Sequence, residues 1–196
     1  MMKKESSRFQ IGRDRIPYLG FLTNKKPLII GCILLIVVIV LFFPINVLDV
    51  YIADKGNDYN KVIYTTKVDL EDTFSVYWTH SVSLRPVIET YKIKNDYNIS
   101  VEEMIFDTFS ANLPASPDYN TKWEYHYNYI KVYDYDLEFD AVPVVIGKVV
   151  ANHKLIYNNN TIVLKDLYKP GGFVKIRAKK INPIQYVLRG LTFSER

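Results

Sequence analysis

One run of 22 residues without a charge constrains this chain more than any other feature of its sequence. The run extends from Pro27 to Leu48 and reads PLIIGCILLIVVIVLFFPINVL. As a helix it would rise about 33 Å, slightly more than the hydrocarbon core of a bilayer, which is roughly 30 Å thick. Lipid offers no hydrogen bonds to the backbone, so a lone spanning segment has to be helical. The sequence therefore predicts a single transmembrane helix over residues 27–48.

The charges on either side of this run predict its orientation. Residues 1–26 carry seven Lys or Arg against two acidic residues, whereas residues 49–196 carry 18 basic and 19 acidic residues. Because Lys and Arg are enriched on the cytoplasmic side of membrane helices, residues 1–26 are expected to form a basic cytoplasmic tail. Residues 49–196 then form an extracytoplasmic domain, and the chain is a single-pass protein of the cell membrane. The basic patch is explained by this topology, so it predicts no nucleic-acid binding.

Two alternatives involve processing of the N-terminus. A cleaved signal peptide has an apolar core of about 7–15 residues followed by small residues, but here the core is longer and is followed by FFP. The sequence IIGC, which ends at Cys32, resembles a bacterial lipobox, yet eleven further apolar residues follow it. An uncleaved anchor is therefore favoured. Cys32 is the only cysteine, so the outer domain is expected to have no disulfide.

Residues 49–196 have the composition of a β domain. They contain 15 of the 16 Tyr and both Trp, together with many Val, Ile and Thr, which suit a pleated surface. No stretch has a sustained apolar period of 3.6 residues. Strands separated by turn residues are expected at 61–68, 73–82, 87–93, 99–109, 122–133, 144–150, 154–157, 161–164 and 173–178. This spacing predicts an all-β fold that is either an antiparallel sandwich or an open barrel.

The segment YWTHSVSLRPVIETYKI, residues 77–93, places ionisable residues inside a predicted β-hairpin. A four-residue turn over residues 83–86 would put His80 directly across from Glu89, where cross-strand Cβ atoms lie about 4.5–5.5 Å apart. A His beside a buried carboxylate offsets the cost of burying its charge. The pair either fixes the strand register or belongs to a binding site. The candidate binding residues are His80, Arg85, Glu89 and Tyr91.

The same hairpin resembles the signature of an uncharacterised bacterial family. The family pattern H-S-V-x-x-x-P-V-x-E-x-Y is matched at every position from His80 to Tyr91, and a later Leu113-Pro114 matches a second family feature without its usual glycines. The family is the domain-of-unknown-function family numbered eighteen-fifty, whose small members carry an N-terminal membrane segment and are commonly encoded beside TAXI-type TRAP solute transporters. The resemblance covers roughly residues 68–178. It implies a membrane location and a transporter context, but no reaction.

Two other patterns suggest binding chemistry but have simpler explanations. Aromatic residues alternate between Trp123 and Tyr135, which suits either the stacking of sugars or bases or the packed face of a central strand. Four carboxylates then alternate with apolar residues: Asp134, Asp136, Glu138 and Asp140. A calcium-binding loop would need Gly and Glu where Phe139 and Val145 stand, so a solvated acidic strand edge is favoured and no metal site is predicted.

Motifs for catalysis are absent from the sequence. There is no Gly-rich phosphate loop, no G-x-S-x-G and no H-E-x-x-H, so no enzymatic activity and no cofactor are expected. The favoured function is a non-enzymatic accessory or partner of a TRAP-type solute transporter, in contact with the lipid bilayer and with the membrane subunits or the solute-binding protein. The alternative is an extracytoplasmic module that binds a small anionic or zwitterionic ligand with His80, Arg85 and Glu89. A hydrolase using His80 and Glu89 as acid and base is the third possibility.

Overall fold

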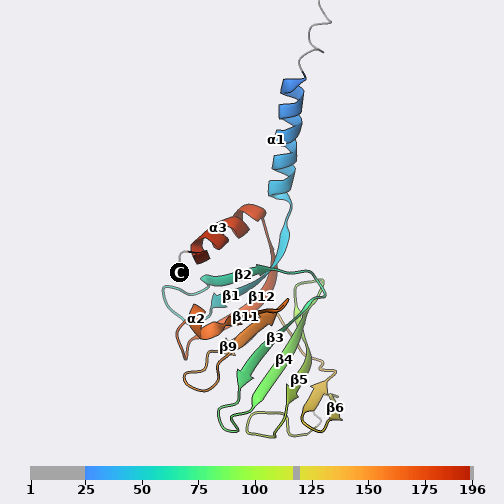
Figure 1. Ribbon diagram of the computed structural model, residues 1–196, viewed down its shortest axis with the longest axis vertical. Helices are drawn as coiled ribbons and strands as arrows, with labels where there is room; N and C mark the ends of the chain where they lie inside the picture. The colour runs from blue at the N-terminus through green and yellow to red at the C-terminus, as the bar shows by residue number, and fades with distance from the viewer. Residues whose placement is uncertain (1–24, 117–119, 195–196) are drawn as a thin grey trace, which may run out of the picture. The chain divides into compact units, whose positions relative to one another are not determined.

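The computed structural model describes residues 25–116 and 120–194, with side chains described as far as Leu191. The expected basic tail, residues 1–26, lies outside the described residues apart from Lys25 and Lys26. The chain divides after Leu41 into two compact units (Figure 1). The described part of the first unit is helical, and the second unit contains every strand.

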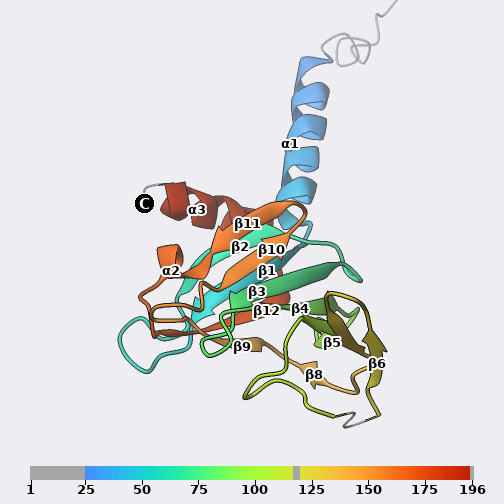
Figure 2. The same cartoon turned by 60° about the horizontal axis from the view of Figure 1, so that its bottom comes forward.

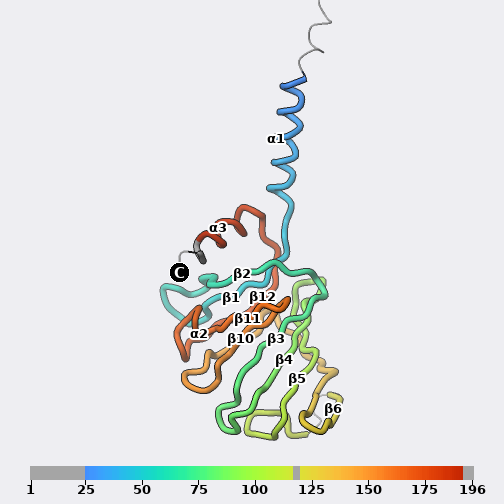
Figure 3. Tube along the Cα trace, in the orientation of Figure 1, coloured from blue at the N-terminus to red at the C-terminus, as the bar shows by residue number. Residues whose placement is uncertain are grey.

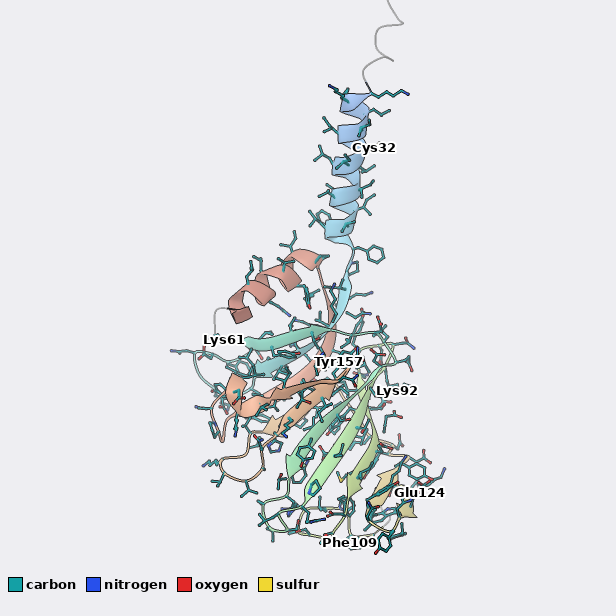
Figure 4. The ribbon with its side chains drawn as sticks, in the orientation of Figure 1. Cys32, Lys61, Lys92, Phe109, Glu124 and Tyr157 are labelled. Atoms are coloured by element: carbon teal, nitrogen blue, oxygen red, sulfur yellow. The ribbon has the colours of Figure 1, made fainter. Side chains whose placement is uncertain are left out.

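The helix α1 (Lys26–Phe42) has 17 residues, and none of them is buried. Its sequence is apolar after Lys26, and the side chain of Cys32 is exposed on its surface (Figure 4). Among the described residues, no helix combines the length and the apolar character needed to span a membrane.

The predicted end of this helix at Leu48 is wrong. The helix ends at Phe42, and the strand β1 (Ile45–Ile52) follows almost immediately. Pro44 has no backbone N–H and disfavours a helical conformation in the residue before it, which explains why the helix stops here. Val47 and Leu48 are completely buried in the β domain. The last residues of the uncharged run therefore belong to a protein core.

The smaller sheet has four antiparallel strands in the order β2 (Val62–Lys67), β1, β12 (Phe173–Ile181) and β9 (Val142–Val145). β1 and β12 come from opposite ends of the domain's sequence and run side by side along their whole length (Figure 3). Their register pairs Ile45 with Ile181 at one end and Ile52 with Val174 at the other. The first and last strands of the domain are therefore joined at its centre.

The larger sheet has eight strands, and its main path runs β11-β10-β3-β4-β5-β7-β6 with β8 paired to β5. The bounds are β3 (Thr73–Thr79), β4 (Pro86–Ile93), β5 (Ile99–Phe106), β6 (Lys122–Tyr125), β7 (Ile130–Tyr133), β8 (Glu138–Phe139), β10 (Lys154–Tyr157) and β11 (Asn160–Val163). All of its pairings are antiparallel. Figure 4 shows Lys92 and Phe109 at opposite ends of this sheet.

One apolar core lies between the two sheets (Figure 2). Leu48 and Ile176 enter it from the smaller sheet, and Phe74, Val76 and Ile93 enter it from the larger one. A second cluster, which includes Phe106, Leu113 and Val132, lies under the loops at one end of the larger sheet. The all-β antiparallel prediction is confirmed, and two sheets sharing a core are consistent with a sandwich.

The prediction of one central strand over residues 122–133 is wrong. These residues form the hairpin of β6 and β7, which is closed by a hydrogen bond from the His126 N–H to the Tyr129 carbonyl (2.9 Å). β6 lies at one edge of the sheet. The alternating aromatic residues are therefore divided between two strands and their turn, and they do not form one platform.

The second unit also contains two helices: the short α2 (Leu164–Leu167) between β11 and β12, and α3 (Pro183–Ser194) after β12. α3 was not predicted. Its N-terminus is capped by the Asn182 side chain, which accepts a hydrogen bond from the Gln185 N–H at 2.8 Å. α3 lies against β2 (Figure 1).

Candidate functional site

The hairpin of β3 and β4 carries the family signature, and its register differs from the predicted one. Thr79 pairs with Pro86 and Val76 pairs with Glu89, so Glu89 does not face His80. The four-residue turn comprises residues 81–84, two residues earlier than expected, and the His80 N–H donates to the Arg85 carbonyl at its base (2.8 Å). The predicted His80–Glu89 pair is therefore wrong.

The local sequence explains this shift of the turn. Leu84 adopts a left-handed backbone conformation with φ of 57°, and Pro86 is the first residue of β4 rather than the last residue of the turn. Proline is tolerated at the first position of a strand because it has no N–H to offer the sheet. The His80 side chain accepts hydrogen bonds from N–H groups of the turn. Turn predictions based on residue type alone do not include such a side-chain acceptor.

His80 is 4% exposed and is surrounded by hydrogen-bond partners. Its Nδ1 faces the N–H groups of Val82 (3.2 Å) and Ser83 (3.3 Å) and the hydroxyl of Ser110 (3.2 Å), while its Nε2 lies 2.7 Å from the Ala111 carbonyl oxygen. A carbonyl can only accept, so this pattern selects the tautomer with its proton on Nε2. His80 therefore joins the hairpin turn to the segment that follows β5.

Arg85 makes a second connection to the same segment. Its Nε donates to Asp107 Oδ2 at 2.8 Å, and a second guanidinium nitrogen also contacts that oxygen. The hydrogen bond and the charge of the guanidinium lower the pKa of the Asp107 carboxyl. Arg85 is thus committed to Asp107 at the protein surface, and together with His80 it holds the turn against residues 107–111.

Glu89 and Tyr91 form a separate group on the inner face of β4. The Tyr91 hydroxyl donates to Glu89 Oε2 at 2.8 Å. Burial raises the pKa of the Glu89 carboxyl, and the bond from Tyr91 opposes that rise. Burial and the neighbouring carboxylate raise the pKa of Tyr91. Of the four candidate residues, only these two are joined through their side chains, whereas His80 and Arg85 are joined through their backbones.

Tyr135 joins this group, although the sequence did not indicate it. Burial and the charge of Glu89 raise the pKa of Tyr135 to about 12. Its hydroxyl oxygen is buried and has no hydrogen-bond partner among the described residues. The preceding Asp134 has a left-handed conformation with φ of 64°, which ends the alternation of β7 and turns the chain. The alternation of side chains along a strand therefore does not predict which way Tyr135 points, because Tyr135 follows this turn.

A hollow of about 490 Å³ opens beside Tyr135. Its lining is Pro114, Ser116, Thr121, Val132, Tyr135, Asp136 and Leu137. Val132 and Glu89 both pair with Met104, so they lie in one row across the larger sheet. Of the group formed by Glu89, Tyr91 and Tyr135, only Tyr135 lines the hollow. We call these three residues the carboxyl–tyrosine cluster.

Two of the acidic residues after β7 are paired with lysines. Lys122 contacts Asp134 at 2.8 Å, and Lys94 contacts Glu138. Across residues 25–116 and 120–194, no group of three or more His, Cys, Asp or Glu side chains has an arrangement that could hold a metal ion. Neutralisation by lysines explains how these carboxylates are accommodated at the sheet edge.

The fold and this site define a β-sandwich domain with a buried carboxyl–tyrosine cluster, preceded in the chain by an apolar helix. Residues 74–164 match the model of a family described as "Domain of unknown function (DUF1850)". The match contains the whole hairpin signature and all three residues of the cluster, and it confirms the family resemblance found in the sequence. Neither the comparison with curated proteins nor the comparison with solved structures found a match.

Proposed function

We propose that this chain is a membrane-anchored, non-enzymatic accessory protein of a TRAP-type solute transporter, with its β domain outside the cytoplasm. The observation that carries the proposal is the order of its parts: an apolar helix without a buried residue directly precedes the β domain. The family resemblance supports the transporter context. The β domain would then contact the membrane subunits or the solute-binding protein.

The proposed anchor is short, because α1 by itself falls below the length and apolar character of a spanning helix. A helix of 17 residues rises about 25 Å, which corresponds to the short end of the range for membrane helices. Lys25 and Lys26 precede its apolar residues, and long lysine side chains reach back to the headgroup region when a helix is short. Phe42 and Phe43 are exposed at the other end. We propose that α1 crosses the bilayer with residues 1–24 on the cytoplasmic side.

Co-purification tests the accessory role. The full chain, tagged at its C-terminus, is extracted from its native host in a mild detergent that keeps the transporter assembled. Recovery of transporter subunits that depends on the β domain is the expected result. The matched control is a chain that keeps residues 1–44 and carries an unrelated β domain. Recovery of the same subunits with the control, or of none with the native chain, contradicts the proposal.

A second candidate function is suggested by the unpartnered Tyr135 hydroxyl next to the hollow. A buried hydroxyl without a partner is costly, and a ligand that supplies an acceptor or donor would remove that cost. Glu89 disfavours an anionic group at this position, and His80 and Arg85 lie elsewhere. The predicted anionic or zwitterionic ligand bound by His80, Arg85 and Glu89 is therefore replaced by a small solute with an apolar body and a hydrogen-bond donor. This function is a ligand-binding module in the same membrane-anchored chain.

Thermal unfolding in the presence of candidate solutes tests this second function. A ligand at 100 times its Kd would raise the free energy of unfolding by about 2.7 kcal/mol. The variant Tyr135→Phe should lose most of this shift while folding normally, because it removes a hydroxyl that has no partner among the described residues. The matched control Tyr127→Phe, at a fully exposed tyrosine, should keep it. Equal shifts in the two variants would exclude the carboxyl–tyrosine cluster as the binding site.

A further inference from the structure

The helix α3 exposes an apolar stripe. Ile184 is 47% exposed, Val187 58%, Leu188 57% and Leu191 61%. These residues follow the spacing i, i+3, i+4 and i+7, which places them on one face of a helix. A soluble helix normally turns such a face toward the core, so the orientation of α3 requires an explanation.

The opposite face of α3 is fixed to the smaller sheet by polar contacts. Arg189 Nη1 donates to both carboxylate oxygens of Asp49, at 2.8 and 3.0 Å, and Asp49 on β1 is completely buried. The ammonium of Lys67 lies over the Tyr186 ring, 5.2 Å from its centroid. These contacts select the orientation of the helix. The apolar stripe therefore points away from the sheet as a defined feature of the fold.

Chain connectivity places the start of α3 close to the end of α1. Ile45, the first residue of β1, pairs with Ile181, the last residue of β12. α1 ends at Phe42 and α3 begins at Pro183, so each helix is separated from this strand pair by only one or two residues. The three peptide links from Phe42 to Ile45 span at most about 11 Å. Both helices therefore join the same end of the smaller sheet.

Basic residues accompany the stripe at this end. Lys180 on β12 and Lys67 on β2 are both exposed, and they lie within one or two residues of the Ile45–Ile181 pair in the strand register. Among the described residues, Lys180 makes no ion pair or ring contact with α3, whereas Lys67 also lies over the Tyr186 ring at the sheet side of the helix. Exposed lysines beside an apolar helix face are typical of surfaces that contact anionic lipid headgroups. This charge pattern favours a phospholipid surface over an apolar protein groove as the occupant.

We propose that α3 is an interfacial helix that lies on the outer surface of the bilayer, with Ile184, Val187 and Leu191 in the boundary between headgroups and acyl chains. This inference rests on the proposed anchoring by α1, because the anchor brings the start of α3 to the membrane. It assigns a lipid-binding surface to residues outside the matched family region. Figure 1 shows α3 and the β3–β4 turn at opposite ends of the β domain, so this contact directs the signature hairpin away from the membrane.

Lipid-borne quenchers test the contact in the full chain. Cys32 is replaced by Ser, a single cysteine is introduced as Val187→Cys, and the chain is labelled with an environment-sensitive fluorophore and reconstituted into vesicles containing phosphatidylglycerol. The matched control is Val149→Cys. Val149 is 91% exposed in the loop after β9, and β9 pairs with the end of β12 that is remote from Ile181. Lipids with a nitroxide near the headgroup should quench the label at position 187 several-fold more than the label at 149.

The experiment distinguishes failure of the anchor α1 from failure of the lipid contact of α3. Flotation of the vesicles reports anchoring by α1, and quenching reports the contact of α3. Chains that float but show equal quenching at positions 187 and 149 overturn the interfacial helix and leave the anchor intact. A label at 187 that is shielded from aqueous iodide but not quenched by nitroxide lipid indicates a covering protein and also overturns the lipid contact. Chains that do not float overturn both.

A second variant checks that the apolar stripe causes the contact. Ile184→Asn combined with Leu191→Asn, in the Val187→Cys background, should reduce nitroxide quenching to the level of the Val149 control. Both replaced side chains are largely exposed, so an unchanged far-ultraviolet circular dichroism spectrum is expected. Quenching that persists in this variant contradicts the role of the stripe.

Discussion

At the scale of single residues, the imidazole of His80 holds separate backbone segments together. It accepts from the N–H groups of its own turn and contacts the Ala111 carbonyl beyond β5. All of these groups would lose a buried partner if the ring were removed, and an unpaired buried group costs about 1–3 kcal/mol. His80 is therefore a structural residue of the signature hairpin, which accounts for one part of the family pattern without any ligand.

The variant His80→Ala should reduce the free energy of unfolding by about 2–3 kcal/mol, because it leaves buried donors unpaired and opens a cavity. Chemical denaturation of the full chain in detergent measures this change. The matched control is His126→Ala, since His126 is exposed and a surface substitution of this kind changes stability by about 0.5 kcal/mol or less. Equal losses in the two variants would show that His80 does not hold the turn.

Glu89 gives a prediction with a defined pH dependence. Its pKa is raised in the folded state, so between its ordinary pKa and the raised value the folded protein binds more protons than the unfolded chain. Stability then falls as the pH rises through this window and is highest below it. Glu89→Gln should be more stable than the native chain at pH 7 by a few degrees in Tm, since about 1 kcal/mol corresponds to about 2–4 °C at this size.

The comparison of Tm values at pH 4 and pH 7 decides this point. The difference between Glu89→Gln and the native chain should nearly vanish at pH 4, where the carboxyl is protonated in both states. The matched control Glu102→Gln replaces an exposed carboxylate on β5 and should show no such difference at either pH. A native chain that is more stable than Glu89→Gln at pH 7 would show that the Glu89 carboxylate is stabilised rather than strained by its surroundings.

At the scale of elements, the attachment of α3 depends on one buried carboxylate. Asp49 contacts Arg189 from α3 and Lys179 from β12, whose ammonium lies 3.2 Å from Oδ2. The sequence did not reveal this cluster, because its members lie at opposite ends of the domain and the first half of β1, residues 45–48, was assigned to the membrane helix. The helix α3 was also missed. Its apolar residues recur with a period of 3.6 residues over only 12 residues, and they face away from the core.

Arg189→Met should destabilise the protein by about 2 kcal/mol. Breaking a buried ion pair costs about 3–5 kcal/mol when the remaining charge has no partner, and here Lys179 still contacts Asp49. Limited proteolysis should also cleave within residues 183–194 at least several-fold faster, because α3 is released from β2. Lys180→Met, at an exposed residue of β12, is the control. Unchanged proteolysis in Arg189→Met would show that the Asp49 contact does not hold α3.

At the scale of the whole molecule, the sequence predicted the fold class because alternation and turn residues act locally. The antiparallel β structure and the position of most strands follow from these signals. Details that depend on distant partners were not predictable in this way: the register at Glu89, the division of residues 122–133 into a hairpin, and the placement of Tyr135. The register at Glu89 and the placement of Tyr135 depend on the left-handed residues Leu84 and Asp134, and the hairpin depends on the backbone turn at residues 126–129.

The candidate site shows the same division. Glu89 and Tyr91 lie two residues apart on one strand, so their shared face follows from the period of a strand. His80 and Arg85 were expected to join them but instead contact the segment after β5. The family pattern thus combines residues that stabilise a turn with residues of the carboxyl–tyrosine cluster, and only the folded structure separates the two roles.

Labelling of cysteines in intact cells tests the membrane-anchored, extracytoplasmic arrangement most directly. With Cys32 replaced by Ser, a membrane-impermeant maleimide should label Val149→Cys before lysis, because that residue is exposed on the β domain. Ser7→Cys in the basic tail should react only after the membrane is opened. If Val149→Cys reacted only after lysis, or if alkaline washing released the chain from the membrane, the arrangement proposed here would be contradicted.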